Sequence, residues 1–362
     1  MPKRTIIKPA SGIRAIAEAL DISVATVHRA LHNQGRVSQA TRERVLRMAE
    51  EQKYQPNLTA RNLRLNRHFR VSVHLPTTIA AFFDSLRAGI EEAASPFRSV
   101  LEVEFHRYTR NPGRAQASLR SALEAGVHGI IAVPPNTTQM ARLVKKARER
   151  AIPVICVSTD SPESGRLTAV TPHPYYGGCM AAEVLAASMR KRGHVVVMAG
   201  DLENLNQTEK VRGFLEMLAR TDANRSVTLI ETRDDPEQAF KGALRCLRET
   251  PQIGGMYVTS ANSIPVLQAL RKQDRLYAIP VVTTDLFPEL VPYLRDGAVR
   301  ATIYQCPEMQ GSLAIRAMYQ YLMESIAPPS CIGVIPQLVI KSNLELYLRK
   351  SAEQAGKTAM RE

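Results

Sequence analysis

Near its N-terminus the chain carries two short helical patterns that are separated by only three residues. Apolar side chains recur at helical spacing over Ile13–Leu20 and again over Val24–Leu31. Ser23, at the end of the intervening turn, is a good N-cap for the second helix. Two short helices on so tight a turn must cross steeply. This predicts a helix-turn-helix, in which the second helix enters the major groove of DNA and its first residues meet the base edges.

A third helical pattern, over residues 38–52, supplies a stripe of Val45, Leu46 and Ala49 that would close a small core. The first seventy residues hold fourteen Lys and Arg against five Asp and Glu, a net charge of +9 out of +14 for the whole chain. Binding to the phosphate backbone requires such an asymmetry. The alternative from these residues alone is a three-helix bundle without a role in DNA binding, because helix-turn-helix patterns often match by chance.

The amino-acid sequence of this region resembles that of the LacI family of bacterial transcriptional regulators. Both the residues and their spacing match, and the match continues beyond the second helix. The matching segments are residues 23–31, 37–38, 41–42, 54–57 and 60–64. The resemblance implies a helix-turn-helix DNA-binding headpiece over residues 1–53 and a hinge helix or linker over residues 54–66.

The resemblance assigns the reading of operator bases to Val24, Ala25 and Arg29. Arg29 can make the bidentate contact with guanine, whereas the other two offer only apolar contact, for instance with a thymine methyl. Contacts with phosphates position a protein without specifying sequence, and they are assigned to Thr26, His28 and Asn33. His28 stands where the family usually has serine, and a neutral imidazole still donates a hydrogen bond to a phosphate.

Residues 54–66 form a separate short element. Pro56 and Asn57 can start a helix, but only about two turns follow, which is too short for a helix that stands alone. The sequence therefore predicts a segment that orders only against a partner. In the family this hinge helix pairs with its dimer mate on the operator, and the resemblance assigns minor-groove contacts to Asn57, Ala60 and Leu63, with Leu63 as an apolar wedge. A plain linker is the alternative.

From Arg70 onward, short apolar runs alternate with helical patterns. Repeated strand–helix units are typical of parallel sheets covered by helices, and their number favours two lobes. The region resembles the family's effector domain, which has the fold of periplasmic sugar-binding proteins. The expected fold is thus a small all-α helix-turn-helix domain followed by an α/β, two-lobed periplasmic-binding-protein-like domain with parallel sheets.

The resemblance places this effector-binding and dimerisation domain at residues 67–350, with a tail over 351–362. Three crossings between the lobes are expected, near Val170, Ala301 and Ile335. They give a first lobe of residues 71–170 and 302–335 and a second lobe of residues 171–301 and 336–350. The ligand would lie between the lobes, at the carboxyl ends of the strands.

Polyol ligands need paired hydrogen-bond donors and acceptors together with an aromatic face. Asp285, Gln305 and Phe83 match ligand-contact positions of the family. Asp160, which follows the apolar run of residues 154–157, is a fourth candidate. For each of these residues the alternative is a capping or loop role.

Two further candidates are departures from the family pattern. Lys210 stands three residues before Gly213, where the family commonly has arginine, and lysine keeps a point charge but loses the bidentate fork. Asn262 follows Ala261, which stands where the family commonly has aspartate. The usual sugar-binding pair is therefore altered, and the expected ligand is a small polar molecule of the carbohydrate class.

The chain lacks the common catalytic and phosphate-binding signatures: GxSxG, HExxH, the P-loop and GxGxxG. The adjacent carboxylates Asp234 and Asp235 precede Pro236 and are expected to mark a helix start. The sequence therefore predicts a protein that is not an enzyme and that needs no cofactor and no metal.

Five cysteines at wide spacing, without a CxxC pair, favour free thiols in a reducing compartment over disulfides or a zinc site. The first ten residues are basic and polar and lack the apolar core of a signal peptide, and no run of eighteen apolar residues occurs. The expected location is the bacterial cytoplasm, at the nucleoid, without a membrane partner.

Together these observations predict a homodimeric, ligand-responsive transcription factor, with repression as its expected mode. Its expected partners are a pseudo-palindromic double-stranded DNA operator, a second copy of the chain and a carbohydrate effector. Two alternatives stay open. One is a sugar-binding transport protein, which shares the large domain. The other is a regulator that responds to a protein or a phosphorylated partner instead of a free sugar.

Overall fold

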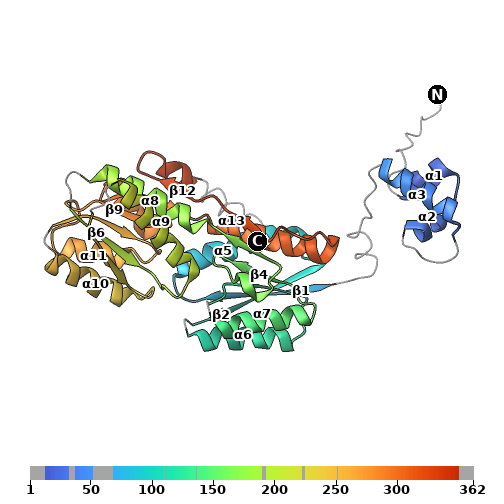
Figure 1. The fold of residues 1–362 in the computed structure, drawn as a ribbon, viewed down its shortest axis with the longest axis horizontal. Coiled ribbons are helices and arrows are strands. Elements are labelled where there is room, and N and C mark those ends of the chain that lie inside the picture. Colours follow the sequence, from blue (N-terminus) through green and yellow to red (C-terminus); the bar gives the residue numbers. More distant parts are fainter. Residues whose placement is uncertain are drawn as a thin grey trace, which may run out of the picture. The chain divides into compact units, whose positions relative to one another are not determined.

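The computed structural model describes residues 13–31, 37–51, 68–109, 111–135, 137–189, 193–221, 225–250 and 252–349. The chain divides into two compact units, Met1–Arg67 and His68–Glu362. Figure 1 labels the helices and strands of both units, and each unit is described here by itself.

The first unit contains the three predicted helices: α1 (Ile13–Leu20), α2 (Val24–Leu31) and α3 (Gln39–Glu51). Their apolar faces meet in one small core, built from Ile16, Ala17, Val27, Ala30, Val45 and Ala49. The Ser23 Oγ accepts the Thr26 backbone N–H at 3.0 Å and so caps α2 as the sequence predicts. Ser38 caps α3 in the same way.

The second unit contains two six-stranded sheets. The first has the strand order β11-β5-β4-β3-β1-β2, and all of its pairs are parallel. Its strands are β1 (Phe69–Pro76), β2 (Leu101–Tyr108), β3 (Gly129–Ala132), β4 (Val154–Val157), β5 (Thr168–Thr171) and β11 (Cys331–Gly333). The predicted parallel architecture is confirmed for this lobe.

The second sheet has the order β12-β10-β9-β8-β6-β7 and is parallel except for its antiparallel β10–β12 pair. Its strands are β6 (His194–Ala199), β7 (Val227–Glu231), β8 (Ile253–Val258), β9 (Val281–Thr284), β10 (Val299–Tyr304) and β12 (Gln337–Val339). Because β6 to β10 are parallel, their carboxyl ends lie at one edge of the sheet, and the strand order changes direction at β6, between β7 and β8.

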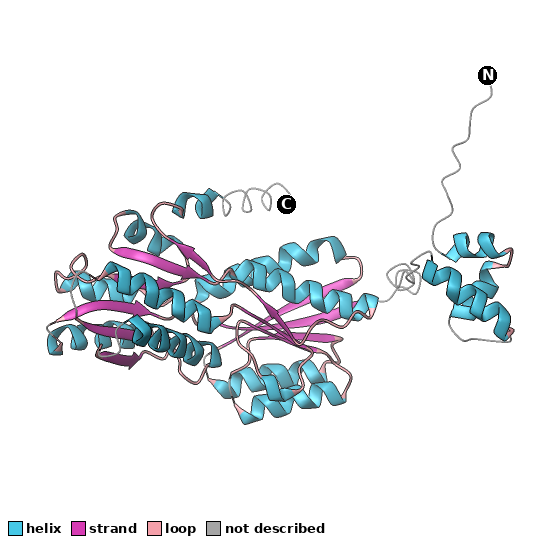
Figure 2. Ribbon diagram, turned by 45° about the horizontal axis from the view of Figure 1, so that its top comes forward, coloured by secondary structure: helices cyan, strands magenta, loops and turns pink. Residues whose placement is uncertain are grey.

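Helices cover both faces of each sheet (Figure 2). On the first sheet, α5 (Ala80–Ala94) and α13 (Pro307–Tyr319) lie on one face, and α6 (Pro112–Glu124) and α7 (Thr138–Glu149) lie on the other. Neighbouring residues of one strand serve opposite faces: Ile131 packs with α5 and α13, whereas Ile130 packs with α6 and α7. This explains why the strands read as continuous apolar runs.

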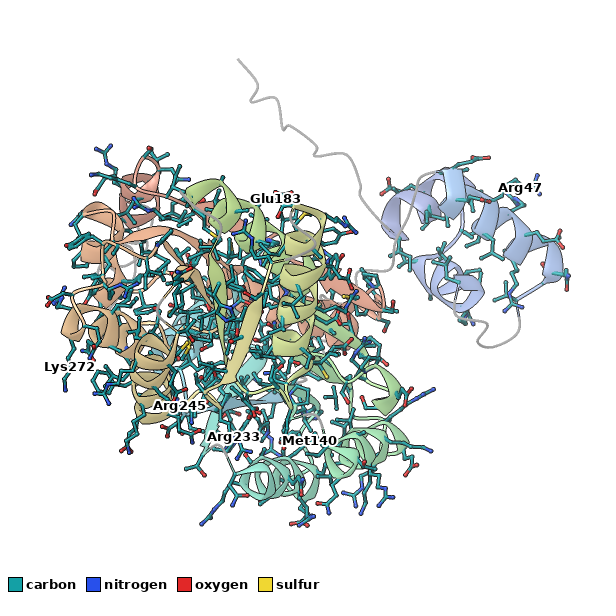
Figure 3. All side chains as sticks on the ribbon, turned by 60° about the vertical axis from the view of Figure 1, so that its left-hand side comes forward. Arg47, Met140, Glu183, Arg233, Arg245 and Lys272 are labelled. Atoms are coloured by element: carbon teal, nitrogen blue, oxygen red, sulfur yellow. The ribbon has the colours of Figure 1, made fainter. Side chains whose placement is uncertain are left out.

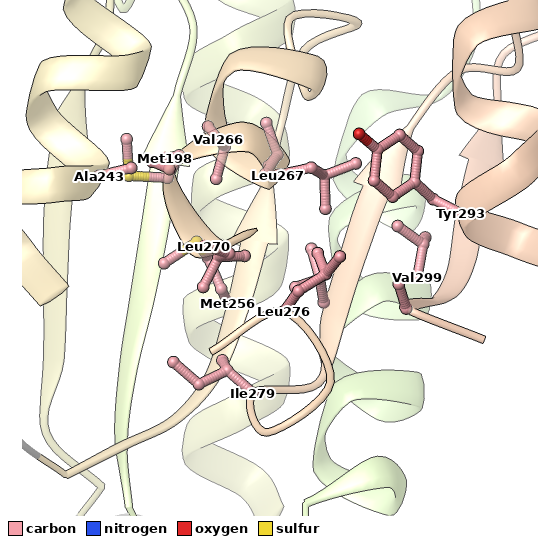
Figure 4. Close-up of a cluster of buried hydrophobic side chains, with 14 of the residues drawn as sticks. Met198, Ala243, Met256, Val266, Leu267, Leu270, Leu276, Ile279, Tyr293 and Val299 are labelled. Carbon is pink, nitrogen blue, oxygen red and sulfur yellow. The ribbon is translucent and has the colours of Figure 1, made fainter. Parts of the chain in front are cut away.

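On the second sheet, α8 (Pro174–Ser188) and α9 (Leu205–Thr221) share one face. The opposite face carries α10 (Pro236–Glu249), α11 (Ile264–Lys272) and α12 (Val291–Arg295). Figure 4 shows the core on that side, where Met198 and Met256 of the sheet meet Leu267 and Leu270 of α11. Short helical turns complete the unit: η1 (Ser95–Phe97), η2 (Pro162–Ser164), η3 (Pro288–Leu290) and η4 (Gln320–Glu324).

The chain passes between the lobes after β5, after β10 and after β11. The first and third passages lie close to the expected positions. The second lies later than Ala301, because the whole of β10 pairs with β9 and β12 in the second sheet. The chain leaves that sheet only at Gln305 and Cys306, where α13 begins.

The sequence predicts that the carboxylates before Pro236 mark a helix start, and one of them does so. Asp235 caps α10, since its carboxylate accepts the Gln238 backbone N–H at 2.8 Å. Within the described ranges, no helix is long and apolar enough to cross a membrane.

Candidate functional site

In the first unit, helix α2 presents an exposed face opposite its core face. Val27 and Ala30 are buried, whereas Val24, Ala25 and Arg29 are exposed. Val24 is 43% exposed, so its side chain is available for apolar contact with a partner. The Arg29 Nε donates to the carbonyl of Ala25 at 3.2 Å, which leaves the outer nitrogens of its guanidinium directed away from the helix turn.

Hydrogen bonds fix the orientation of this face. The hydroxyls of Thr26 and Ser23 lie 2.8 Å apart, so Thr26 takes part in the cap of α2. The Arg42 Nε, on α3, donates to the carbonyl of Ala30 at 3.3 Å and ties the end of α2 to α3. The side chain of His28 and all of Asn33, Asn57, Ala60 and Leu63 lie outside the described residues.

In the second unit, Lys210 is the centre of a polar group at the carboxyl edge of the second sheet. It lies on α9 and is buried, and its Nζ donates to the carbonyl of Thr259, after β8, at 3.0 Å. Burial lowers the pKa of its ammonium to about 8, although Asp285 and Asp234 oppose that shift by their charge. Two carboxylates thus share one buried cation.

Close backbone packing holds Lys210 at this depth. A Cβ atom at Gly178 of α8 would lie 2.0 Å from the carbonyl oxygen of Lys210, and one at Gly213 of α9 would lie 2.0 Å from that of Tyr175. Only glycine at both positions lets α8 and α9 approach so closely. The resulting contact fixes the helix that carries the lysine against the sheet edge.

Asp285 follows β9 in the left-handed backbone conformation, with a φ of 67°. Its carboxylate accepts the backbone N–H of Gln305 at 3.2 Å and the side-chain Nε2 of Gln305 at 2.7 Å. Burial raises the pKa of this carboxyl to about 6, against the opposing effects of Lys210 and Gln305. The strain and the burial are tolerated because hydrogen bonds from neighbouring groups hold the residue in place.

Asp234 is a member of this group that the sequence pattern assigned only to a helix start. It follows β7 and is half-buried, and its Oδ2 accepts the backbone N–H of Asp201 at 3.4 Å. Burial raises the pKa of its carboxyl. The two carboxylates therefore differ in role: Asp235 caps α10, whereas Asp234 interacts with the charge of Lys210. Its place directly after a strand of the second sheet was the signal that could have found it.

Several buried polar atoms at this edge have no hydrogen-bond partner among the described residues. They come from neighbouring segments at the strand ends: Asn206 Oδ1, Asp234 Oδ1, Asn262 Nδ2, Ser263 Oγ and Gln305 Oε1. Leaving a buried polar atom unpaired costs about 1–3 kcal/mol. Both donors and acceptors are among them, which is the pattern that a polar ligand with several hydroxyl groups would satisfy.

Asn206, also unforeseen, connects the two lobes. It stands at the start of α9 in the second lobe, and its Nδ2 donates at 2.7 Å to the carbonyl of Ser158, which follows β4 in the first lobe. The carboxyl ends of the two sheets therefore touch at this point. Ser158 adopts a φ of 67°, which turns its carbonyl toward Asn206.

The two candidates from the first lobe are engaged within that lobe. Phe83 is 5% exposed and packs in the core of α5 and the first sheet, edge-on to Phe82 with ring centroids 5.0 Å apart. Asp160 accepts from Arg166 through both carboxylate oxygens, one of them at 2.6 Å, and from the Ser161 backbone N–H at 2.6 Å. Their assignment as ligand contacts stays a prediction, whereas Lys210, Asp285 and Gln305 form one connected group.

A hollow of about 1200 Å³ lies elsewhere on the second unit. It runs along α5 and α13 and continues onto the segment of η3 and α12, so that both lobes line it. Apolar lining residues include Phe97, Phe287, Val291, Leu313 and Tyr319. Met309, at its margin, is 44% exposed. Lys210, Asp234 and Asp285 do not line this hollow, which is therefore distinct from the group at the strand ends.

Comparison with known families identifies both units. Residues 12–57 match the family described as bacterial regulatory proteins, lacI family. Residues 71–325 match the periplasmic binding protein domain family. The order of the two matches is the order of the two units in the structure.

Individual proteins share this organisation. The chain is 26% identical to catabolite control protein A of Priestia megaterium over 57% of its own length and 60% of that protein. It is 20% identical to the HTH-type transcriptional repressor PurR of Mannheimia succiniciproducens over 92% of its own length and 98% of that protein. The alignment with the first relative thus spans less than two thirds of that relative.

Among solved structures, an ABC transporter solute-binding protein from Agrobacterium vitis, bound with α-D-tagatopyranose, superposes with a TM-score of 0.71. It is 22% identical and covers 76% of this chain and 96% of its own, so it shows the two-lobed fold. A periplasmic binding protein domain that follows a lacI-type headpiece distinguishes a regulator from a transport protein. The chain belongs to the LacI family of bacterial transcriptional regulators.

Proposed function

We propose that this protein is a transcriptional repressor controlled by an uncharged carbohydrate or a derivative of one, bound between its lobes. The observation that carries the proposal is the group of Lys210, Asp234 and Asp285 at the strand ends, together with the buried polar atoms around it that have no partner among the described residues. It lies in a chain whose other unit presents a DNA-reading helix. A transport protein has no use for that helix.

The charges at the site favour a neutral ligand. The group combines one ammonium with two carboxylates, so it offers no surplus positive charge to a phosphate or a carboxylate of the ligand. Carboxylates and amides that accept and donate in pairs suit hydroxyl groups instead. The related Agrobacterium vitis protein holds a pyranose in the same fold.

We assign the ligand contacts to Lys210, Asp234, Asp285, Gln305 and Asn262 in the second lobe, with Asn206 at the boundary. Phe83 and Asp160 remain the candidates from the first lobe. A ligand that closes the lobes would strengthen contacts such as that between Asn206 and Ser158. Closure would change the affinity for DNA, and by linkage DNA would change the affinity for the ligand.

For DNA we assign base contacts to Val24, Ala25 and Arg29 and phosphate contacts to Thr26, His28 and Asn33. The exposure of Val24, Ala25 and Arg29 on one face of α2 supports the first set. Minor-groove contacts fall to Asn57, Ala60 and Leu63. Two copies of the chain would read the two halves of a pseudo-palindromic operator.

Fluorescence anisotropy on a labelled duplex from the protein's own upstream region tests the proposal, with a scrambled duplex as control and a panel of sugars and sugar phosphates at fixed salt. We expect preference for the native duplex and a change in affinity with a neutral sugar. The Lys210→Met variant should bind DNA as the wild type does but lose the response to the sugar.

Lys241→Met is the matched control, because Lys241 is exposed and pairs with Glu237 far from the site. It should respond to the sugar as the wild type does. A response to sugar phosphates alone would contradict the neutral ligand. If neither class changes DNA binding and no metabolite raises the melting temperature, a protein partner becomes the better candidate for the effector.

A further inference from the structure

The positive charge of the second unit is concentrated in one segment. Residues 71–362 hold thirty-four Lys and Arg against twenty-nine Asp and Glu, a net charge of +5. Residues 110–150 alone hold eight against two, a net of +6, so the remainder of that unit carries a net charge of −1. The excess is therefore a local property of the segment that contains α6 and α7.

The segment folds into two adjacent helices on the outside of the first sheet (Figure 1). Leu119, Met140 and Val144 point inward and are buried in the core beneath them. The basic side chains are exposed on the outside: Arg114 and Arg120 on α6, and Arg142, Lys145, Lys146 and Arg148 on α7. These six residues define the α6–α7 basic face. Arg150 is excluded from it because its Nη1 donates to the carbonyl of Leu123 at 3.1 Å.

The charges of this face are not neutralised from within the protein. Some cations on other helices do pair with carboxylates, as Arg212 does with Glu209 and Glu216 on α9 and Lys241 does with Glu237 on α10. Among the described residues, no ion pair joins a side chain of the α6–α7 basic face to a carboxylate. With the exposed Glu124 and Glu149, the two helices keep six cations against two carboxylates, a net charge of +4 that favours binding of an anion.

The composition of the face indicates the class of partner. Protein interfaces depend on buried aromatic or aliphatic anchors at their centre. None of the large apolar side chains exposed in the described residues belongs to α6 or α7. Ser121 on α6 and Thr138 on α7 are also exposed and add hydroxyl groups to the surface of these helices. A polar, strongly positive surface without apolar anchors is typical of contacts with a nucleic-acid backbone.

We propose that the α6–α7 basic face is a second DNA-binding surface, which contacts phosphates without reading sequence. DNA is the polyanion to which this family of regulators already binds through the headpiece. The face would add affinity for DNA of any sequence and would leave the choice of operator to α2. An acidic protein is the competing partner, and the lack of apolar anchors argues against it.

The test uses full-length protein and a labelled random-sequence duplex of about 60 base pairs, with the dissociation constant measured across a range of salt concentrations. The test variant is Arg142→Gln/Lys145→Gln/Lys146→Gln on α7. The matched control, Lys241→Gln/Arg245→Gln/Arg248→Gln, removes three exposed charges from one helix, α10, in the other lobe. Figure 3 labels Arg245 on α10 and Met140 on α7, which lie on separate helices.

Each phosphate contact contributes about 0.9 to the slope of log K against log salt. We therefore expect the slope of the α7 variant to be shallower than that of the control by about 1 to 3, with affinity lower by roughly tenfold or more at low salt. Circular dichroism and melting curves should match the wild type, because all three side chains are exposed.

Equal slopes and equal affinities for the α7 variant and the α10 control would overturn the proposal. It would also be overturned if the α7 substitutions left DNA binding unchanged but abolished binding of an acidic protein. These outcomes are separate from the repressor proposal. Preference for the operator over a scrambled duplex tests the headpiece, whereas the slope on random DNA tests the α6–α7 basic face.

Discussion

At the scale of single residues, the buried carboxyl of Asp285 predicts a pH dependence of stability. Its pKa is about 6 in the folded protein, compared with an ordinary 3.8. A raised folded-state pKa means that this group contributes stability below its unfolded pKa, and that this contribution is lost as pH rises through about 6. A pKa difference of about two units between the folded and unfolded protein corresponds to about 3 kcal/mol in the free energy of unfolding.

The measurement is the free energy of unfolding by urea, at steps from about pH 7 to about pH 4, for the wild type and for Asp285→Asn. As pH falls, the free energy of unfolding of the wild type should rise relative to that of Asp285→Asn, by up to about 3 kcal/mol. Lys210 stays charged in this window because its pKa is about 8. A difference that is constant with pH would show that the carboxyl titrates normally.

Arg29 gives a second prediction at this scale, for the recognition helix. The variant Arg29→Lys keeps the positive charge but loses the planar fork that can bind guanine through two hydrogen bonds. We expect affinity for the operator to fall by about 1–3 kcal/mol, while affinity for a scrambled duplex changes little. Anisotropy with both duplexes at one salt concentration measures this. An equal loss on both duplexes would mean that Arg29 contacts only phosphate.

The same scale shows what the sequence could and could not predict about the site. Asp285 and Gln305 could be singled out because they match family positions at strand ends, and Lys210 because it replaces the arginine that is common at its position in the family. Asp234 was not separated from Asp235, since both can begin a helix and only the fold shows which one turns inward. The Arg166 that engages Asp160 lies six residues away, across a turn that the residue pattern does not describe.

At the scale of elements, the contact between α8 and α9 predicts that alanine at two adjacent glycine positions, 177 and 178, will affect the stability of the protein differently. An Ala side chain at position 178 would place its Cβ 2.0 Å from the carbonyl oxygen of Lys210, so Gly178→Ala must push α9 away. At position 177 the nearest atom is a methyl group of Ile303 at 3.5 Å, an ordinary contact. Gly177→Ala is therefore the matched control.

We expect Gly178→Ala to destabilise the protein by about 3 kcal/mol or more through overpacking. Gly177→Ala should be neutral or should stabilise it by up to about 1 kcal/mol, because alanine favours helix. Urea denaturation measures the free energy of unfolding of both variants and of the wild type, and the comparison tests this prediction. Equal stability of both would mean that the helices separate at little cost, and that Lys210 is not held by their packing.

The alternation of strands and helices was predictable because each buried strand is an apolar run and each helix carries an apolar stripe. Which sheet a strand joins was not predictable. Strand β10 has apolar residues that would suit either lobe, and only its pairing with β9 and β12 assigns all of it to the second sheet. The second crossing therefore lies at Gln305, and this placement brings Gln305 to the carboxylate of Asp285.

At the scale of the whole molecule, two surfaces of the second unit have separate roles in the proposed repressor. The strand ends would bind the effector, and we expect the hollow along α5 and α13 to contact the second copy. That hollow is lined by both lobes, so a partner seated in it would sense their relative position. Met309, an exposed apolar side chain at its margin, is the best single residue with which to test this.

We expect Met309→Arg to lower the dimer fraction, because a buried charge without a partner would oppose association. Each monomer then reads a single half-site, so affinity for the operator should fall steeply while the melting temperature changes little. Leu215→Arg is the matched control, since Leu215 is exposed on α9 away from the hollow. Sedimentation velocity measures association, and anisotropy measures operator binding. If Met309→Arg remains dimeric with full affinity, the two copies associate through a different face, and coupling between effector and DNA must then pass through that face instead.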